Sequence, residues 1–133
     1  MLKTSKLISI RNKKRKMLLV QRKKDPPGVH SFPGGKRKRS ESARKAVRRE
    51  LKQELPEAKC RVGKIFSKSN GTSRKKGVRV EAKDTFFFGK VTGKLTRGKE
   101  IRSAAYMVPW HIRFTRSARA QRDKLHASGY LKR

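Results

Sequence analysis

Residues 41–55 form the segment whose pattern restricts the fold most. Apolar residues recur in it at intervals of three and four, as they do on one side of an α-helix. These residues are Ala43, Ala46, Val47 and Leu51. Ser40 stands where an N-cap accepts a hydrogen bond from a free backbone N–H group, and Pro56 ends the segment. We therefore expect a single amphipathic helix over residues 41–55 that buries its apolar side.

The other apolar runs are short enough to be β-strands. The expected strands cover residues 2–10, 17–21, 60–66, 78–91 and 101–108, and the first two are expected to pair with each other. Residues 31–35 are expected to lead into a glycine turn, and Asn70-Gly71 and Lys76-Gly77 carry turn residues. A second helix is expected at residues 117–128, followed by Gly129. This order predicts the α+β class, with a mixed β-sheet sandwiched by helices in a single domain over residues 1–133.

The net charge indicates a polyanionic partner. The chain has 40 Lys and Arg against 9 Asp and Glu, a formal charge of +31. Self-repulsion at this density opposes a compact state, and nucleic acid relieves it because each neutralised phosphate releases counterions. No base-reading motif is visible, so we expect contacts to backbone phosphates of RNA or another polyanion. The residues expected to make them are Lys13, Lys14, Arg15, Lys16, Lys36, Arg37, Lys38, Arg39, Arg74, Lys75 and Lys76.

Cysteine content and hydropathy bear on the compartment. Cys60 is the single cysteine, which excludes an internal disulfide, and it is expected to be a buried small apolar side chain. No apolar run approaches the roughly 18 residues that a membrane span needs. The first residues lack the apolar region of a secretory signal. We expect an intracellular protein, cytoplasmic or organellar, with no membrane partner.

Acidic residues stand at fixed gaps around the expected helix. Gly35 is followed after five residues by Glu41, and after seven more by Arg49-Glu50-Leu51, with Glu54 three residues beyond Leu51. This spacing, with the lead-in at residues 31–35, resembles the signature of the Nudix hydrolases. The resemblance is strong over residues 31–55 and loose over most of the rest. It implies a Nudix fold and metal-dependent hydrolysis of a nucleoside diphosphate linked to another group, or of a pyrophosphate carried by RNA.

The chemistry of these residues agrees with that resemblance. Glu50, Gln53 and Glu54 share one helix face. Their oxygens suit Mg²⁺ or Mn²⁺, which clamps a pyrophosphate and helps to generate hydroxide from water. Arg49 can tie to Glu41 and orient the carboxylates. The expected catalytic residues are therefore Glu41, Arg49, Glu50 and Glu54, and the expected metal ligands are Glu50, Gln53 and Glu54. The expected substrate contacts are Gly34, Gly35, Lys36 and Arg37.

Two departures from the signature leave alternatives open. Gln53 replaces a glutamate and gives a weaker metal ligand, and Pro56 and Glu57 replace a glycine and an aliphatic residue. The glutamates could instead form a solvated helix face paired with neighbouring cations. The protein could be a Nudix-fold RNA-binding component of a ribosome or mitoribosome with a relic site. It could also be an engineered, supercharged hydrolase whose charge has no evolved role.

Residues outside the signature carry weaker indications. Glu81 and Glu100 could supply an extra ligand or a general base, although a surface role is the more frequent one. Phe32, Tyr106 and Trp110 could stack on a base, but aromatic residues beside strands more often belong to the core. The three histidines have no ligand spacing, so no zinc site is expected.

Overall fold

The computed structural model describes residues 1–133, except for the side chains of Ser73 and Arg74. Its strands are β1 (Leu2–Ile8), β2 (Ile10–Arg11), β3 (Lys16–Arg22), β4 (Val29–His30), β5 (Gly34–Lys36), β6 (Ala58–Lys75), β7 (Val78–Gly93), β8 (Ile101–Met107) and β9 (Arg113–Phe114). Its helices are α1 (Ala43–Glu54) and α2 (Arg116–Ala127). In the described part of the chain, neither helix is long and apolar enough to cross a membrane.

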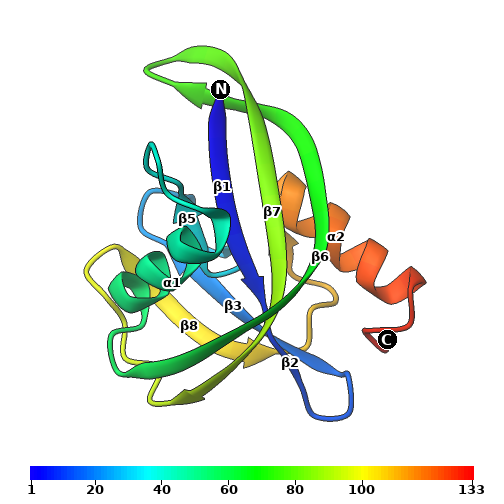
Figure 1. Cartoon of the computed structure of the whole chain (residues 1–133). Helices are drawn as coiled ribbons and strands as arrows, with labels where there is room; N and C mark the ends of the chain where they lie inside the picture. The colour runs from blue at the N-terminus through cyan, green and yellow to red at the C-terminus, as the bar shows by residue number, and fades with distance from the viewer.

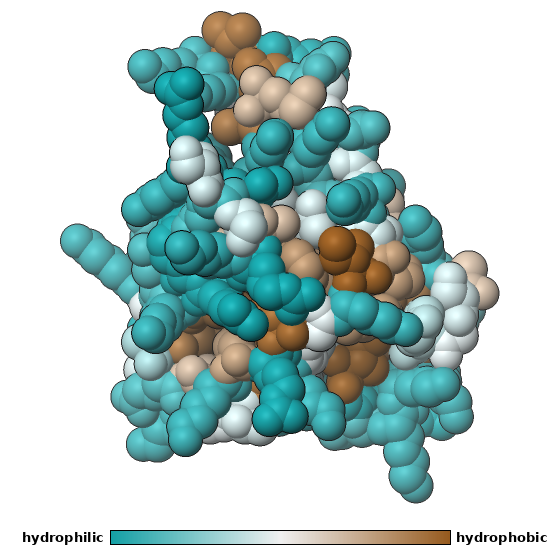
Figure 2. Space-filling model, viewed as in Figure 1, coloured by the Kyte–Doolittle hydropathy of each residue, from teal (hydrophilic) through white to brown (hydrophobic). Residues whose placement is uncertain are grey.

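The two helices lie on opposite sides of the sheets (Figure 1), and hydrophilic side chains cover most of the face seen in Figure 2. The main sheet has the order β5-β1-β7-β6, in which β1 and β7 run parallel and the other pairs run antiparallel. A second sheet has the order β2-β3-β8, and β4 pairs with β9. The expected α+β architecture, a mixed sheet between helices, is confirmed.

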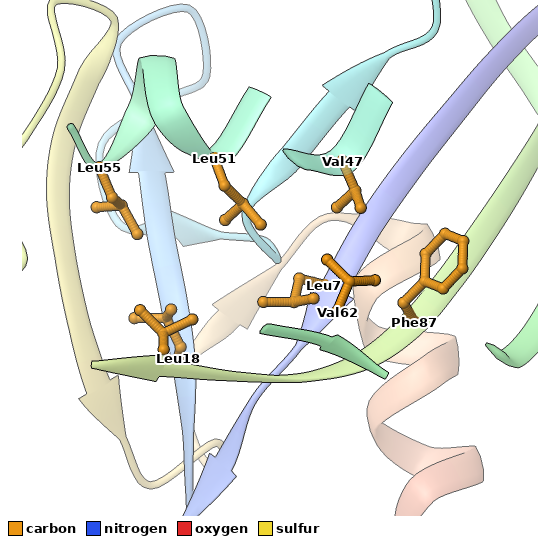
Figure 3. Packing of buried hydrophobic residues seen from close by; sticks show 8 residues of the cluster. Leu7, Leu18, Val47, Leu51, Leu55, Val62 and Phe87 are labelled. Carbon is orange, nitrogen blue, oxygen red and sulfur yellow. The ribbon is translucent and has the colours of Figure 1, made fainter. Parts of the chain in front are cut away.

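Neighbouring residues of the central strands face two separate cores, because side chains alternate along a strand. Leu7 packs in a cluster with α1, whereas Ile8 packs in a cluster with α2. Phe87 and Phe86 divide in the same way. Figure 3 shows the first cluster, where the apolar side chains of α1 point at the strands. Strands buried on both faces account for apolar runs without alternation.

The apolar pattern of α1 is confirmed, but its start is not where the sequence placed it. Ser42, not Ser40, is the N-cap, since its side chain accepts a hydrogen bond from the Lys45 N–H group at 3.1 Å. Ser40 has a φ of +71°, outside the extended conformation that an N-cap adopts. Ala43 is partly buried and packs at the edge of the core, whereas Ala46, Val47 and Leu51 are buried as expected.

The expected pairing of residues 2–10 with residues 17–21 is wrong for most of its length. β1 pairs with β5 and β7, and only the two residues of β2 pair with β3. The backbone N–H and C=O groups of a buried strand need hydrogen-bond partners along both of its edges. A hairpin with residues 17–21 would supply a partner along one edge only. Gly34 and Gly35 likewise lie in β5 and do not form a turn.

β6 and β7 form one long hairpin, and its turn is at Lys76–Gly77. Both turn residues have positive φ, +53° and +77°, which suits a two-residue hairpin loop. The turn expected at Asn70-Gly71 is wrong, because both residues lie inside β6, opposite Lys83 and Ala82. A hairpin reverses the chain once, and this reversal occurs at Lys76–Gly77. Asn70-Gly71 therefore stays in the strand despite its turn-forming residues.

Candidate active site

Arg49 joins the carboxylates of Glu41 and Glu50. Its Nε and Nη2 atoms donate to the two carboxylate oxygens of Glu41 at 2.8 and 2.9 Å. Its Nη1 atom donates to Glu50 Oε1 at 3.0 Å. Nη2 also donates to the backbone oxygen of Lys36 at 2.9 Å. The expected link between Arg49 and Glu41 is therefore present, and it fixes the loop before α1 against the helix.

Glu54 is held by a buried guanidinium that the sequence did not single out. Arg22, at the end of β3, donates from Nε to Glu54 Oε2 at 3.1 Å, and its Nη2 lies 3.0 Å from the same oxygen. The remaining Arg22 donors bond to Ser31 Oγ and to the backbone oxygens of Phe32 and Gly34. The position of Arg22 at the end of an apolar strand could have indicated a buried arginine. Arginines at strand ends are more often exposed to solvent, so this signal is weak.

The two glycines of β5 bring Glu50 and Glu54 to one place. The Gly34 N–H group donates to Glu54 Oε1 at 2.8 Å. A Cβ atom added to Gly35 would lie 2.6 Å from Glu50 Cδ, so only glycine leaves room for this carboxylate. Two glutamates one helical turn apart therefore face the same short strand, as the signature implies.

Hydrogen bonds lower the pKa of one glutamate of the site, and burial raises the pKa of another. The hydrogen bond from Arg49, with one from the Lys38 N–H group, lowers the pKa of Glu41 to about 2. Burial raises the pKa of Glu54 and outweighs the opposing charge of Arg22. Burial, then the charge of Arg22, lowers the pKa of Lys6 to about 8. Lys6 is a further residue that the sequence reasoning missed, and its Cα is paired with Gly34.

The donor set fits a divalent cation that takes oxygen ligands. A carboxylate has about four lone-pair directions. Glu54 Oε1 accepts one hydrogen bond, and Glu50 Oε2 accepts none from the described residues, so each keeps room for a cation. Gln53, the third expected ligand, is exposed and lines a groove on another flank of α1. Among the described residues, no three His, Cys, Asp or Glu side chains gather around a possible metal position.

The expected substrate and nucleic-acid contacts are only partly together. Lys36 is exposed beside Gly35, and the Arg37 guanidinium donates to the backbone oxygen of Glu41, so it braces the loop. The residues at 13–16 lie in the β2–β3 turn, and Lys75 and Lys76 lie at the tip of the β6–β7 hairpin, at the far end of the molecule (Figure 1). Arg74 falls outside the described side chains.

The weaker candidates differ in burial and position, and the backbone of Glu100 accepts a hydrogen bond from Lys23, the residue after Arg22. Glu81 is exposed on β7, and Glu100 is exposed before β8. Phe32 is fully buried in the α2 core, and Tyr106 and Trp110 pack partly buried against the two clusters. Cys60 packs against the α1 core as a small apolar side chain but is only partly buried, where the sequence predicted a buried one.

Comparison with known proteins identifies the family. A model of the NUDIX domain matches residues 2–127, so the chain belongs to the Nudix family. The fold is similar to the E. coli ORF135 protein (23% identity, TM-score 0.74, 97% of this chain and 93% of that one). It is also similar to a NUDIX hydrolase from Nitrosomonas europaea (18% identity, TM-score 0.76, 96% and 89%). A structure of UDP-X diphosphatase has 13% identity and a TM-score of 0.74 over 96% and 63%. No curated protein matches the sequence.

Proposed function

We propose that this chain is a metal-dependent pyrophosphohydrolase of nucleoside diphosphates linked to another group. The observation that carries the proposal is the meeting of Glu50 and Glu54 at Gly34–Gly35, each with a carboxylate oxygen free to take a cation. The matched family model and the similarity to the structure of UDP-X diphosphatase support it. The intracellular location expected from the sequence stays part of this proposal.

Each residue of the site has a role in that proposal. Glu50 and Glu54 hold the cation, whereas Gln53 lines the groove on another flank of α1 and is not part of this set. Arg49 fixes the direction of Glu50 and anchors Glu41, while Arg22 fixes Glu54. A bound Mg²⁺ or Mn²⁺ supplies charge neutralisation for the pyrophosphate and lowers the pKa of water. The exposed Lys36 lies beside Gly35, where it can contact a substrate phosphate.

A second candidate function is RNA binding with a relic site. Arginines already pair with all three glutamates of the signature, and Gln53 removes a fourth carboxylate. Such a protein would bind RNA and hydrolyse nothing. The charge of +31 supports attraction to RNA under both candidates, through backbone phosphates.

The two candidates are separated by hydrolysis assays on protein freed of nucleic acid. A panel of nucleoside diphosphate derivatives is incubated with Mg²⁺, and products are compared with those formed in the presence of a chelator. We expect metal-dependent products that Glu50→Gln and Glu54→Gln both abolish. Gln53→Glu should leave Mg²⁺ affinity and the rate unchanged, because residue 53 lines the groove on another flank of α1.

The matched control is Asp123→Asn, which changes an exposed carboxylate on α2. Circular dichroism shows which variants remain folded, and Glu50→Gln keeps the test valid if Glu54→Gln unfolds. Absence of products from the whole panel, with the protein folded and Mg²⁺ present, would favour the relic-site reading instead.

A further inference from the structure

A groove of about 720 Å³ runs along the outer flank of α1, beside the start of β6. In Figure 1, the chain leaves α1 and turns back so that β6 begins beneath the helix. The groove is lined by Arg48, Arg49, Leu51, Lys52, Gln53, Ala58, Lys59 and Cys60. The turn between α1 and β6 is short, so helix and strand form two fixed walls.

The rim of the groove is cationic. Arg48, Arg49, Lys52 and Lys59 are four of its eight lining residues, and no carboxylate is among the eight. Arg49 is neutralised by Glu41 and Glu50. No ion pair between described side chains involves Arg48, Lys52 or Lys59. Three cations therefore stand along one groove without an internal counter-charge.

The floor of the groove is apolar. Ala58 and Cys60, which are partly buried at the edge of the α1 core, line it, and the buried Leu51 lies behind them. An inorganic anion or a polyphosphate gains nothing from such a floor. A ligand that carries a flat, weakly polar group beside each negative charge can contact both the cationic rim and the apolar floor. A nucleotide with an unpaired base is such a ligand, since its phosphate suits the rim and its base suits the floor.

Gln53 acquires a physical meaning in this groove. It is exposed, and it stands where the family signature has a glutamate. A glutamate here would offer its charge to the neighbouring cations and repel phosphate. Glutamine leaves the groove without negative charge, so this departure from the signature favours a polyanion on this flank.

We propose that this groove binds a single-stranded nucleic acid, with backbone phosphates at Arg48, Lys52 and Lys59 and a base over the floor formed by Ala58 and Cys60. A duplex keeps its bases paired and stacked, so it can meet the cationic rim but not the floor. The proposal concerns binding and does not rest on hydrolysis. It also differs from the expectation of nucleic-acid contacts at the charged turns.

Cys60 provides a direct test, because it is the only cysteine in the chain and it lines the groove. Burial raises the pKa of its thiol, so its reaction with a thiol reagent is slow and easily timed. The full chain is incubated with a single-stranded RNA of about ten nucleotides, or with the matching duplex, each at saturation. We expect the single strand to slow the modification of Cys60 at least fivefold and the duplex to leave its rate unchanged.

Two triple variants separate the groove from the general charge. The groove variant carries Arg48→Gln, Lys52→Gln and Lys59→Gln, and the control carries Lys13→Gln, Arg15→Gln and Lys76→Gln. Both lose the same charge and the same residue types. Each phosphate contact contributes about 0.7 to the slope of log affinity against log salt for a single strand. The groove variant should therefore lower this slope by about 2, and the control by less than about 0.7.

Three results would overturn the proposal. Unchanged Cys60 reactivity under saturating RNA would place the nucleic acid elsewhere. Equal protection by the duplex would remove the argument for an unpaired base. Equal slopes for the two triple variants would mean that the total charge, and not the groove, sets binding. These measurements follow binding alone, so a protein that hydrolyses none of the nucleotide derivatives would still give the three results expected for the groove.

Discussion

Replacing Arg22 with methionine tests whether the site and the fold share one support. Arg22 is buried, and its guanidinium bonds to Glu54, to Ser31 Oγ and to two backbone oxygens. Methionine fills similar volume but leaves the buried Glu54 carboxylate without its counter-charge. Breaking a buried ion pair from one side costs about 3–5 kcal/mol. A domain of this size is stable by about 5–15 kcal/mol, so we expect Arg22→Met to lose a large share of the free energy of unfolding.

The assay is urea unfolding followed by circular dichroism, with Glu54→Gln as the second arm of a double-mutant cycle. A neutral glutamine needs no counter-charge, so Arg22→Met should cost only about 1–2 kcal/mol in that background. Arg119→Met, an exposed arginine on α2, is the matched control and should cost less than about 0.5 kcal/mol.

The loss should also depend on pH. Burial already raises the pKa of Glu54, and removing Arg22, which lowers it, should raise it further. A carboxyl group whose folded pKa lies above its unfolded value is penalised only where it is ionised. The cost of Arg22→Met should therefore fall, below about pH 4, to the roughly 1–2 kcal/mol expected in the neutral Glu54→Gln background, and should grow as the pH rises. A pH-independent cost, or additive single variants, would refute the ion-pair argument.

Three further predictions concern other groups of the site. Because its pKa is lowered to about 2, Glu41 adds stability that is complete above pH 4.5 and is lost as the pH falls through 2. The urea midpoint of Glu41→Gln should lack this part of the pH dependence, and a profile like that of the unchanged protein would contradict the prediction. Gly35→Ala should lower metal-dependent hydrolysis about tenfold or more, because a Cβ atom there displaces Glu50, while urea unfolding shifts little; retained activity would contradict it. Lys6→Met should raise the free energy of unfolding at pH 7 by on the order of 2 kcal/mol, because the lowered pKa of Lys6 means that its charged form destabilises the folded state. This gain in stability should fade between pH 8 and 10.5. A gain that persists at pH 10.5 would contradict the reasoning.

Local patterns predicted the parts of the site that local structure determines. The helix, its buried side and the link between Arg49 and Glu41 follow from helical spacing and from the fixed gaps of the signature. Ser40 and Ser42 are the same residue type, and the structure separates them by the φ of +71° at Ser40 and by the hydrogen bond that Ser42 accepts from the Lys45 N–H group. That the whole of residues 1–133 forms one domain stays a prediction.

Tertiary packing decided the parts that the sequence could not. Arg22 reads as an exposed strand end, and it becomes buried only because residues 31–34 fold over it. Asn70-Gly71 carries a strong turn signal, yet pairing across the long hairpin keeps it in β6. The groove beside α1 joins residues of the helix to the start of the next strand, and no spacing rule relates the two.

The parallel pairing of β1 with β7 governs the order in which the chain can fold. Thr4 lies opposite Asp84, and Ser5 lies opposite Thr85, so the contact closes a loop of about eighty residues. During synthesis, β1 has to wait until β7 has emerged before the central pair can form. Pairings between distant segments slow folding, so we expect this chain to fold more slowly than a helical protein of equal length. Until then β1 has only the short β5 as a strand partner, and the surrounding lysines and arginines keep such incomplete chains apart by repulsion.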